Sequence, residues 1–534
     1  MSLKPPVKIL DSEPHHEEHT VQVMAEEIEK IPLQVARRVG LWVKVVYGIG
    51  QVPNAMKGIL FGIFSLYFYT TVMGLSGSLV GIAMAIGLVW DAIIDPVIGT
   101  LSDNVEGRLG KRHGFMLLGA AGMGVSFWAY FSPPDNLSTY ALFAWLLVTN
   151  LLVRTMTSIF GIPYYALGAE LSEDYHERTS VSAFRSAFAL AGTLMTVALS
   201  FILFFPETTH GGDPKLNIEG YWAMGLFSGL VMTLAGLVSM FGTLSYRQFV
   251  CHKNKSPFTG TLHRFFANTM LALRNPSFRM LFISYSIFFL GTVVNATLSI
   301  HFLTYYVRIT SSKALSLFHL SFFVAALVGV VFWLRASRMI EKRWLYFAGT
   351  LSTSIVMGCA FLVLGEGRLF GTGNLLPLLI GHGIAGFFAS VLWIIPASMI
   401  ADIADEDELL NGERREGTFF GLFYFGEQIA AGASVLVAGV LIDWFAGLIP
   451  GQTHQSAITI SRIGMLYSLL PSALLGIGAL FIMRYSLDQH KVIAIQLELA
   501  KAQTLQKQFV FNHDLQDSKP THKKRTSLET GEAI

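Results

Sequence analysis

Two carboxylates lie four residues apart within one apolar run. Asp91 and Asp95 interrupt residues 76–101, a stretch long enough to cross a membrane as a helix. On a helix the two side chains project from the same face, with their Cβ atoms about 6 Å apart. In a low-dielectric interior, two such anions must share a proton, hold a cation or meet a basic side chain. The pair therefore predicts ion or proton handling at a site that faces away from lipid.

A purely structural role is the competing interpretation of this acidic pair. The acids would then only neutralise Lys57 or Arg154 and so hold helices together. Pro96 favours a functional site, because its missing N–H leaves the carbonyl oxygen of Ala92 free beside the acids. We therefore expect a functional site, as is usual for ionisable residues inside membrane spans.

The composition is that of an integral membrane protein. Of the 534 residues, 52% are hydrophobic and 14% are charged, whereas about 25% of a soluble domain is charged. The formal net charge is only +2 and the basic residues are scattered, so nucleic acid is not an expected partner. Cys251 and Cys359 offer no disulfide framework or metal cluster. Because no phosphate-binding loop or nucleophile–base pair stands out, we expect neither an enzyme nor a cofactor.

About twelve apolar runs of spanning length predict an all-α membrane protein. They lie near residues 43–72, 76–101, 113–131, 139–168, 182–205, 220–245, 277–307, 314–335, 344–365, 375–401, 418–446 and 463–485. An even number puts both termini on one side, and the Lys and Arg residues of the connections make that side cytoplasmic. We expect a multi-pass protein of the plasma membrane, or of the inner membrane in a bacterium.

A polar segment, 247–276, divides the chain into two six-helix halves, 43–246 and 277–486. A faint repeat supports this division, since Pro163 and Pro396 are 233 residues apart and Glu177 and Glu413 are 236 apart. Such a repeat is typical of a duplicated transporter whose site lies between the halves near mid-membrane. We expect the remaining segments, 1–42 and 487–534, to be cytoplasmic, the second with an amphipathic helix and a disordered tail.

Other polar side chains fall inside the predicted spans and are further candidates for a central site. They are Asn54, Lys57, Arg154, Ser158, Arg185, Asn295, His301, His382, Trp393, Glu427 and Gln428. Single histidines in such places are more often structural than proton-carrying. If Lys57, Arg154 and Arg185 face the acidic pair and Glu427, the interior has no net charge, or nearly none, before any ligand binds. Their presence also hints at an anionic group on the ligand.

The run from Trp90 to Gly99 resembles the helix-two signature of the melibiose-permease family, the glycoside–pentoside–hexuronide:cation symporters of the major facilitator superfamily. Further similar stretches are 47–50, 99–112, 162–164, 184–185, 400–405 and 412–417, so the resemblance spans about residues 43–505. It implies the major facilitator fold, in which two pseudo-symmetric six-helix halves rock about a central site. It also implies uptake driven by Na⁺ or H⁺, and we expect the protein to function as a monomer.

The resemblance implies a cation site made of Asp91 and Asp95, joined by Ser158 where the family often has Thr. The two acids would be metal ligands only if the ion is Na⁺. Ile94 stands where Na⁺-coupled relatives often have Asn. Because a hard cation needs several oxygen ligands, this change favours H⁺ or a poorer Na⁺ site.

The resemblance also implies where a substrate would bind. Arg185 and Trp393 match positions associated with sugar binding, and Tyr165 is the aromatic residue of helix four. Three positions depart from the family pattern, because acidic or basic residues are replaced by Gly161, Asn54 and Gln428. A hydroxyl-binding site without those partners should discriminate against galactosides. The candidate substrate-binding residues are thus Asn54, Lys57, Arg154, Gly161, Tyr165, Arg185, Trp393 and Gln428.

The matching cytoplasmic loops imply a gating role for Asp103, Arg108, Asp402 and Arg414. The leading hypothesis is a symporter that imports a sugar-like or anionic organic solute with H⁺ or Na⁺, with membrane lipid as its other partner. One alternative is cation-coupled transport of an amphiphile such as a lysophospholipid, because vertebrate lysophospholipid symporters share the acidic helix-two pattern. A second alternative is a non-transporting membrane receptor on a transporter fold.

Overall fold

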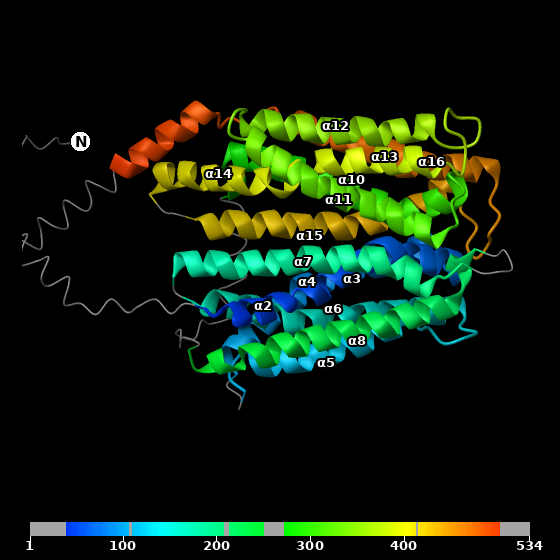
Figure 1. The fold of residues 1–534 in the computed structure, drawn as a ribbon, viewed down its shortest axis with the longest axis horizontal. Coiled ribbons are helices and arrows are strands. Elements are labelled where there is room, and N and C mark those ends of the chain that lie inside the picture. The colour runs from blue at the N-terminus through cyan, green and yellow to red at the C-terminus, as the bar shows by residue number, and fades with distance from the viewer. Residues whose placement is uncertain are drawn as a thin grey trace, which may run out of the picture.

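The computed structural model describes residues 39–105, 109–172, 174–207, 213–249, 272–412 and 415–501. All the regular structure in these ranges is helical, and most helices run along the long axis of the molecule (Figure 1). The predictions for Arg108, Arg414, the N-terminal segment, most of 247–276 and the end of the chain lie outside the described residues.

The helices of the first half of the chain alternate with short connections. They are α2 Leu41–Ile49, α3 Val52–Tyr67, η1 Phe68–Val72, α4 Gly77–Asn104, α5 His113–Tyr130, α6 Thr139–Glu170, α7 Tyr175–Phe204, η2 Pro214–Leu216, α8 Ile218–Thr243 and η3 Leu244–Phe249. Within this set, α5 packs against α6 and α8, α4 against α6, and α7 against α2 and α3. We call these helices the N-terminal set.

The second half forms the C-terminal set. Its helices are α10 Pro276–His301, η5 Phe302–Tyr306, α11 Ser312–Ala336, α12 Lys342–Val363, α13 Leu375–Ala389, η6 Ser390–Trp393, α14 Ile395–Asn411, α15 Glu416–Leu441, η7 Ile442–Ala446 and α16 Ala457–Ile482. Here α16 packs against α10 and α12, and α13 against α11. In Figure 1 this set occupies the upper part of the molecule and the N-terminal set the lower part.

The main contacts between the two sets are those of α4 with α15, α7 with α11, and α3 with α10, and smaller ones join α4 to η7 and α3 to α15. The first pair is close because glycines face each other. A Cβ added at Gly439 would lie 2.2 Å from the Gly77 carbonyl oxygen, and one at Gly81 would lie 2.9 Å from the Cα of Leu436. Small residues of this kind let membrane helices approach backbone to backbone.

Eleven helical segments in the described ranges are long and apolar enough to cross a membrane. The remaining predicted span, 113–131, corresponds to α5, whose eighteen residues include His113 and several glycines. This helix packs against both α6 and α8.

The predicted span 375–401 is not one continuous helix. It consists of α13, the 3₁₀ turn η6 and α14, with Pro396 in the first turn of α14. Because proline has no N–H to donate to the preceding turn, an α-helical ladder cannot run unbroken through this point. The break puts Trp393 at the junction between the two helices.

Residues 489–501 form a helix at the end of the described chain. Val492 and Ile495 pack against the hydrophobic core of the C-terminal set, and Gln496 donates a hydrogen bond of 3.2 Å to the Asp405 carboxylate. Leu497 is exposed on the other side. One side of this helix thus packs on the C-terminal set, and the amphipathic helix expected within 487–534 stays a prediction.

Candidate functional site

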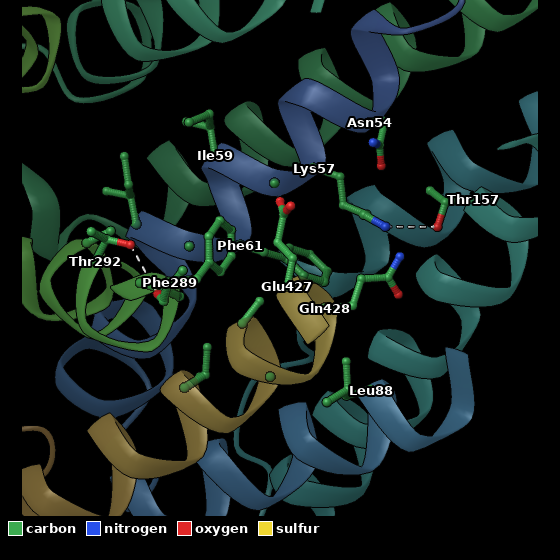
Figure 2. Close-up of a pocket in the computed structure, with 18 of the residues that line it drawn as sticks. Asn54, Lys57, Ile59, Phe61, Leu88, Thr157, Phe289, Thr292, Glu427 and Gln428 are labelled. Carbon is green, nitrogen blue, oxygen red and sulfur yellow. Dashed lines mark hydrogen bonds between the residues drawn. The ribbon is translucent and has the colours of Figure 1, made fainter. Parts of the chain in front are cut away.

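A cavity of about 770 Å³ lies between the two sets of helices. Its N-terminal wall comes from α3, α4, α5 and α6, and its C-terminal wall from α10, α11, α12, α13, η6 and α15. Figure 2 shows one part of it, where Lys57 on α3 and Thr157 face Glu427 and Gln428 on α15. The cavity is large enough for a drug-sized organic ligand.

The acidic pair faces this cavity. Asp91 and Asp95 are one helical turn apart on α4, and both line the cavity wall. The Oδ1 atom of each carboxylate is buried and has no hydrogen-bond partner among the described residues. By contrast, Ile93 on the same helix is 55% exposed on the outer surface. The helix therefore turns both acids toward the cavity and Ile93 away from it, in agreement with the predicted shared face of Asp91 and Asp95.

Arg154 on α6 forms an ion pair with the Oδ2 atom of Asp91. Its Nε donates a hydrogen bond of 3.1 Å to Asn150 Oδ1, and the Asn150 amide in turn donates to the Ala83 carbonyl at 2.9 Å. An ion pair with Arg154 is what we would expect if the acids served only to hold helices together. It lies at the cavity wall, however, and it leaves one oxygen of Asp91 unbonded.

Asp95 has different neighbours. Ser158 lines the cavity one helical turn along α6 from Arg154, and its hydroxyl lies beside the Asp95 carboxylate. Lys57 donates a long hydrogen bond of 3.4 Å to the Thr157 hydroxyl. Within the described part of the chain, no carboxylate oxygen lies within 4.0 Å of the Lys57 ammonium group. No Lys, Arg or His nitrogen in that part lies within 4.0 Å of an Asp95 carboxylate oxygen. The acidic pair is thus only half neutralised by direct contacts.

The charges that line the cavity do not balance. Among its described lining residues, three are acidic (Asp91, Asp95 and Glu427) and two are basic (Lys57 and Arg154). The formal charge of the wall is therefore −1. From the sequence, a neutral interior would need Arg185 as a third positive charge. Arg185 does not line the cavity. Its guanidinium lies over the ring of Tyr165, 5.3 Å from the centroid.

The other substrate candidates of the N-terminal set do line the cavity. Tyr165 and Gly161 are both in its wall, and Asn54 donates a hydrogen bond of 3.3 Å to the Tyr165 hydroxyl. Because Gly161 has no side chain, Tyr165 lies next to open space on this face of α6. Arg185 contacts the site through Tyr165.

The C-terminal wall is rich in aromatic side chains. Trp393 and Gln428, both predicted, are part of it, and so are side chains that the sequence did not single out: Tyr285, Phe288, Phe289, Phe322, Phe323 and His319. Aromatic residues are common in all the apolar spans, so no residue type marked these as cavity-lining. His319 could have been found as a polar residue inside a predicted span.

The histidines separate into two groups. His301 lies outside the cavity lining and shares a hydrogen bond of 3.0 Å with the Thr70 hydroxyl. His382 lines the cavity with its ring against Phe318, and its Nδ1 is buried without a partner in the described ranges. Only His382 of these two is therefore placed to meet a ligand.

The described gating candidates form ion pairs within their own set of helices. Asp103 pairs with Arg112 at 2.6 Å, and Arg112 also pairs with Glu170 at 2.9 Å. Burial disfavours the charged guanidinium, but these two carboxylates outweigh it and raise the pKa of Arg112. Asp402 pairs with Lys342 at 2.6 Å in the C-terminal set. The acids thus tie α4 to α5 and α14 to α12.

At the opposite end of the helices, hydrogen bonds cross between the two sets. The Asp443 carboxylate accepts bonds from the backbone N–H groups of Gly77, at 2.9 Å, and Ser78, at 2.7 Å. Thr70 meets His301 there, and the Ser312 hydroxyl donates to the Phe205 carbonyl. These contacts hold the two sets together at the end where α4 begins.

The model of one protein family, described as "MFS/sugar transport protein", matches residues 46–489 of the sequence. The chain belongs to this family. The match confirms the predicted major facilitator membership, and together with the eleven apolar helices it makes the chain a multi-pass membrane protein.

The relatives of this family member are transporters. An isoprimeverose transporter from Lactiplantibacillus pentosus is 25% identical, over 83% of this chain and 88% of the relative. A sodium-dependent lysophosphatidylcholine symporter from Gallus gallus is 23% identical, over 85% and 88%. Among solved structures, a D-xylose–proton symporter aligns with a TM-score of 0.58 at 16% identity, covering 84% of this chain and 98% of that one. The family and its neighbours confirm the prediction that the protein is not an enzyme.

Proposed function

We propose that this protein is a secondary active symporter that couples entry of H⁺ or Na⁺ to uptake of a sugar-like or anionic organic solute. The main support for this proposal is the acidic pair. Asp91 and Asp95 line a cavity between the two sets of helices, and each has a buried carboxylate oxygen without a hydrogen-bond partner in the described structure. Relatives named as symporters and sugar transporters support the same activity.

In this proposal the coupling ion joins Asp91 and Asp95, with the Ser158 hydroxyl as a third oxygen. One monovalent cation would bring the formal charge of the wall from −1 to zero. The substrate would then bind between the polar N-terminal wall and the aromatic C-terminal wall, near Asn54, Lys57, Tyr165, Trp393 and Gln428. By reciprocity, ion and substrate strengthen each other's binding.

We further propose the full major facilitator architecture. It has twelve spans with α5 as the third, halves at 43–246 and 277–486, and cytoplasmic segments at 1–42, 247–276 and 487–534. Hydrogen bonds at the outer ends of the helices support an inward-facing state, with Asp103, Arg108, Asp402 and Arg414 gating the cytoplasmic side. Both termini would lie in the cytoplasm, and the protein would act as a monomer in the plasma membrane.

A second candidate substrate class is supported by the aromatic wall. Tyr285, Phe289 and Phe322 offer an extended apolar surface that a simple sugar would not cover. A named lysophosphatidylcholine symporter among the relatives supports a cation-coupled amphiphile transporter. Competition between labelled lysophosphatidylcholine and simple glycosides would separate this class from the first.

The first experiment chooses the substrate and then tests coupling. A thermal-shift screen of purified protein against glycosides, hexuronates and lysophosphatidylcholine identifies stabilising compounds, because ligands of the folded state raise its apparent stability. The best compound is then labelled and its accumulation is measured in proteoliposomes with an imposed Na⁺ or pH gradient.

We expect Asp91→Asn and Asp95→Asn each to abolish gradient-driven accumulation while keeping the wild-type elution profile. Asp135→Asn removes an exposed acid of an outer connection and is the matched control. Undiminished accumulation by both site variants would refute the proposal. Binding without accumulation by the wild type would instead support a receptor.

A further inference from the structure

The guanidinium of Arg154 occupies part of the site that the proposed function assigns to the coupling ion. It pairs with Oδ2 of Asp91, and each of the two side chains is only 13% exposed. A cation that joins Asp91 and Asp95 must therefore come close to a positive charge that is already there. Like charges repel strongly in a partly buried site, so the two cations compete.

Residues of two helices, α6 and α4, fix the position of the Arg154 side chain. Asn150 is fully buried and directs the guanidinium, since its Oδ1 accepts from Nε while its amide is held by the Ala83 carbonyl. Gly87 on α4 leaves the space that the side chain fills. A Cβ at Gly87 would lie 2.5 Å from Arg154 Nε and 2.3 Å from Asn150 Nδ2.

Lys57, the other basic residue of the wall, is placed differently. It donates to Thr157 at 3.4 Å, and no described carboxylate oxygen lies within 4.0 Å of it. Lys57 thus contributes a positive field without holding either acid. Removing it changes the charge of the cavity by the same amount as removing Arg154, but breaks no ion pair.

We propose that Arg154 is a resident counter-ion of the acidic pair, which neutralises Asp91 when the site is empty and which the coupling ion must displace. This inference rests on the proposed symport. Arg154 keeps an empty transporter from carrying two bare acids in the membrane, where unpaired buried charges are costly. It also weakens ion binding, so that the ion alone does not saturate the site.

The test measures ion binding without transport. Purified full-length protein is titrated with Na⁺ at constant ionic strength and pH, and the response is followed by thermal stability and by tryptophan fluorescence. Trp90 is a natural reporter, because it precedes Asp91 and its Nε1 donates a 2.8 Å hydrogen bond to Thr155 on the helix that carries Arg154.

We expect Arg154→Gln to lower the Na⁺ concentration at half response by about tenfold, the equivalent of about 1.4 kcal/mol, or to create a Na⁺ response if the wild type has none. Lys57→Gln, which removes the same charge, should give a clearly smaller shift. An equal shift in these two variants would overturn the proposal, because it would reflect net charge alone.

Gly87→Ala tests the same idea with every charge retained. Its added methyl group should push the guanidinium off Asp91 and so reproduce the direction of the Arg154→Gln shift. Gly99→Ala on the same helix is the control, since its Cβ would meet only Ile162, at an ordinary 3.6 Å. This variant keeps the test informative if Arg154→Gln does not fold.

The two proposals fail in different ways. Unchanged Na⁺ dependence in Arg154→Gln and Gly87→Ala, or no response in any variant, would overturn the role of Arg154. Gradient-driven uptake by the wild type would still stand in that case. Absence of coupled uptake by the wild type would overturn the symport itself.

Discussion

At the scale of single residues, Asp95 and Asp91 have different surroundings although they share one helical face. Asp91 is held by Arg154, whereas Asp95 has the Ser158 hydroxyl beside it and no described basic group within 4.0 Å. Asp95 therefore has no direct counter-ion among the described residues, and Ser158 is its candidate co-ligand.

Ser158→Ala should weaken ion coupling without removing it. The change deletes one oxygen next to Asp95, and a hard cation depends on the number of its oxygen ligands. We expect the ion concentration at half-maximal uptake to rise about tenfold, the equivalent of about 1.4 kcal/mol. Ser158→Thr keeps the hydroxyl and should retain wild-type dependence. Equal ion dependence in Ser158→Ala and wild type would exclude the hydroxyl as a ligand.

Trp393→Ala should affect the substrate and leave ion binding unchanged. Trp393 is 46% exposed at the C-terminal wall of the cavity, with its ring centroid 6.4 Å from that of Phe323, whereas the acidic pair belongs to the N-terminal wall. Losing this ring removes apolar contact worth about 1.4 kcal/mol or more, so the half-saturating substrate concentration should rise about tenfold or more. Trp393→Phe should be intermediate. A shifted Na⁺ titration in substrate-free Trp393→Ala would contradict this separation of roles.

The sequence could place some of these residues and not others. The spacing of Asp91 and Asp95 predicts a shared face, and the cost of facing lipid predicts its direction, so both line the cavity. The same reasoning does not fix which way Arg185 points, because a long side chain near a helix end can turn to several neighbours. Arg185 lies over Tyr165 instead of in the wall, and its role in binding stays a prediction.

At the scale of helices, Asp443 links η7 of the C-terminal set to the first turn of α4. The orphan N–H groups at a helix start carry partial positive charge, so a carboxylate there is a favourable partner. Gly77 and Gly439 allow this approach, since each would bring a Cβ against the opposite backbone. In the orientation proposed above, we propose that this contact is a latch that keeps the outer end closed.

Asp443→Asn should weaken the latch by about 1.5–3 kcal/mol, the range for hydrogen bonds to charged groups, and shift the population toward an outward-open state. The reporter is Val435→Cys, a 7% exposed position of the cavity wall, in a chain with Cys251 and Cys359 replaced by Ser. A membrane-impermeant maleimide added from the outside should label the Asp443→Asn protein faster.

Glu219→Gln is the control for this experiment, because Glu219 is an exposed acid at the start of α8 with no cross-set contact in the described structure. Equal labelling rates in Asp443→Asn and wild type would mean that the carboxylate does not hold the outer end.

Apolar run length was enough to locate most spans, because a membrane helix needs about 20 apolar residues whatever its packing. It could not detect the break at η6, since Pro396 is compatible both with a first helical turn and with a kinked helix. Nor could it detect the π-helical ends of α3, α10 and α15. Such segments depend on how the neighbouring helices pack, which one sequence does not record.

At the scale of the whole molecule, the cavity charge makes a prediction about electrical behaviour. With a wall of formal charge −1, one monovalent ion per cycle is the simplest loading. Uptake of a neutral glycoside would then carry one positive charge, and an inside-negative potential should raise its accumulation about tenfold for every ~60 mV. Uptake of a hexuronate would be insensitive to potential. Valinomycin-clamped potassium gradients in proteoliposomes measure both, and the opposite pattern would contradict the one-ion loading.

Coupling is tested most directly by asking whether a substrate gradient alone drives the ion across the membrane. An inward gradient of the substrate chosen by thermal shift is imposed on proteoliposomes without any ion gradient, while ²²Na⁺ entry and internal pH are recorded together. The account predicts that wild-type protein moves Na⁺ or H⁺ inward with the substrate and that Asp95→Asn moves neither. Substrate entry without ion movement in the wild type, or undiminished ion movement in Asp95→Asn, would contradict it.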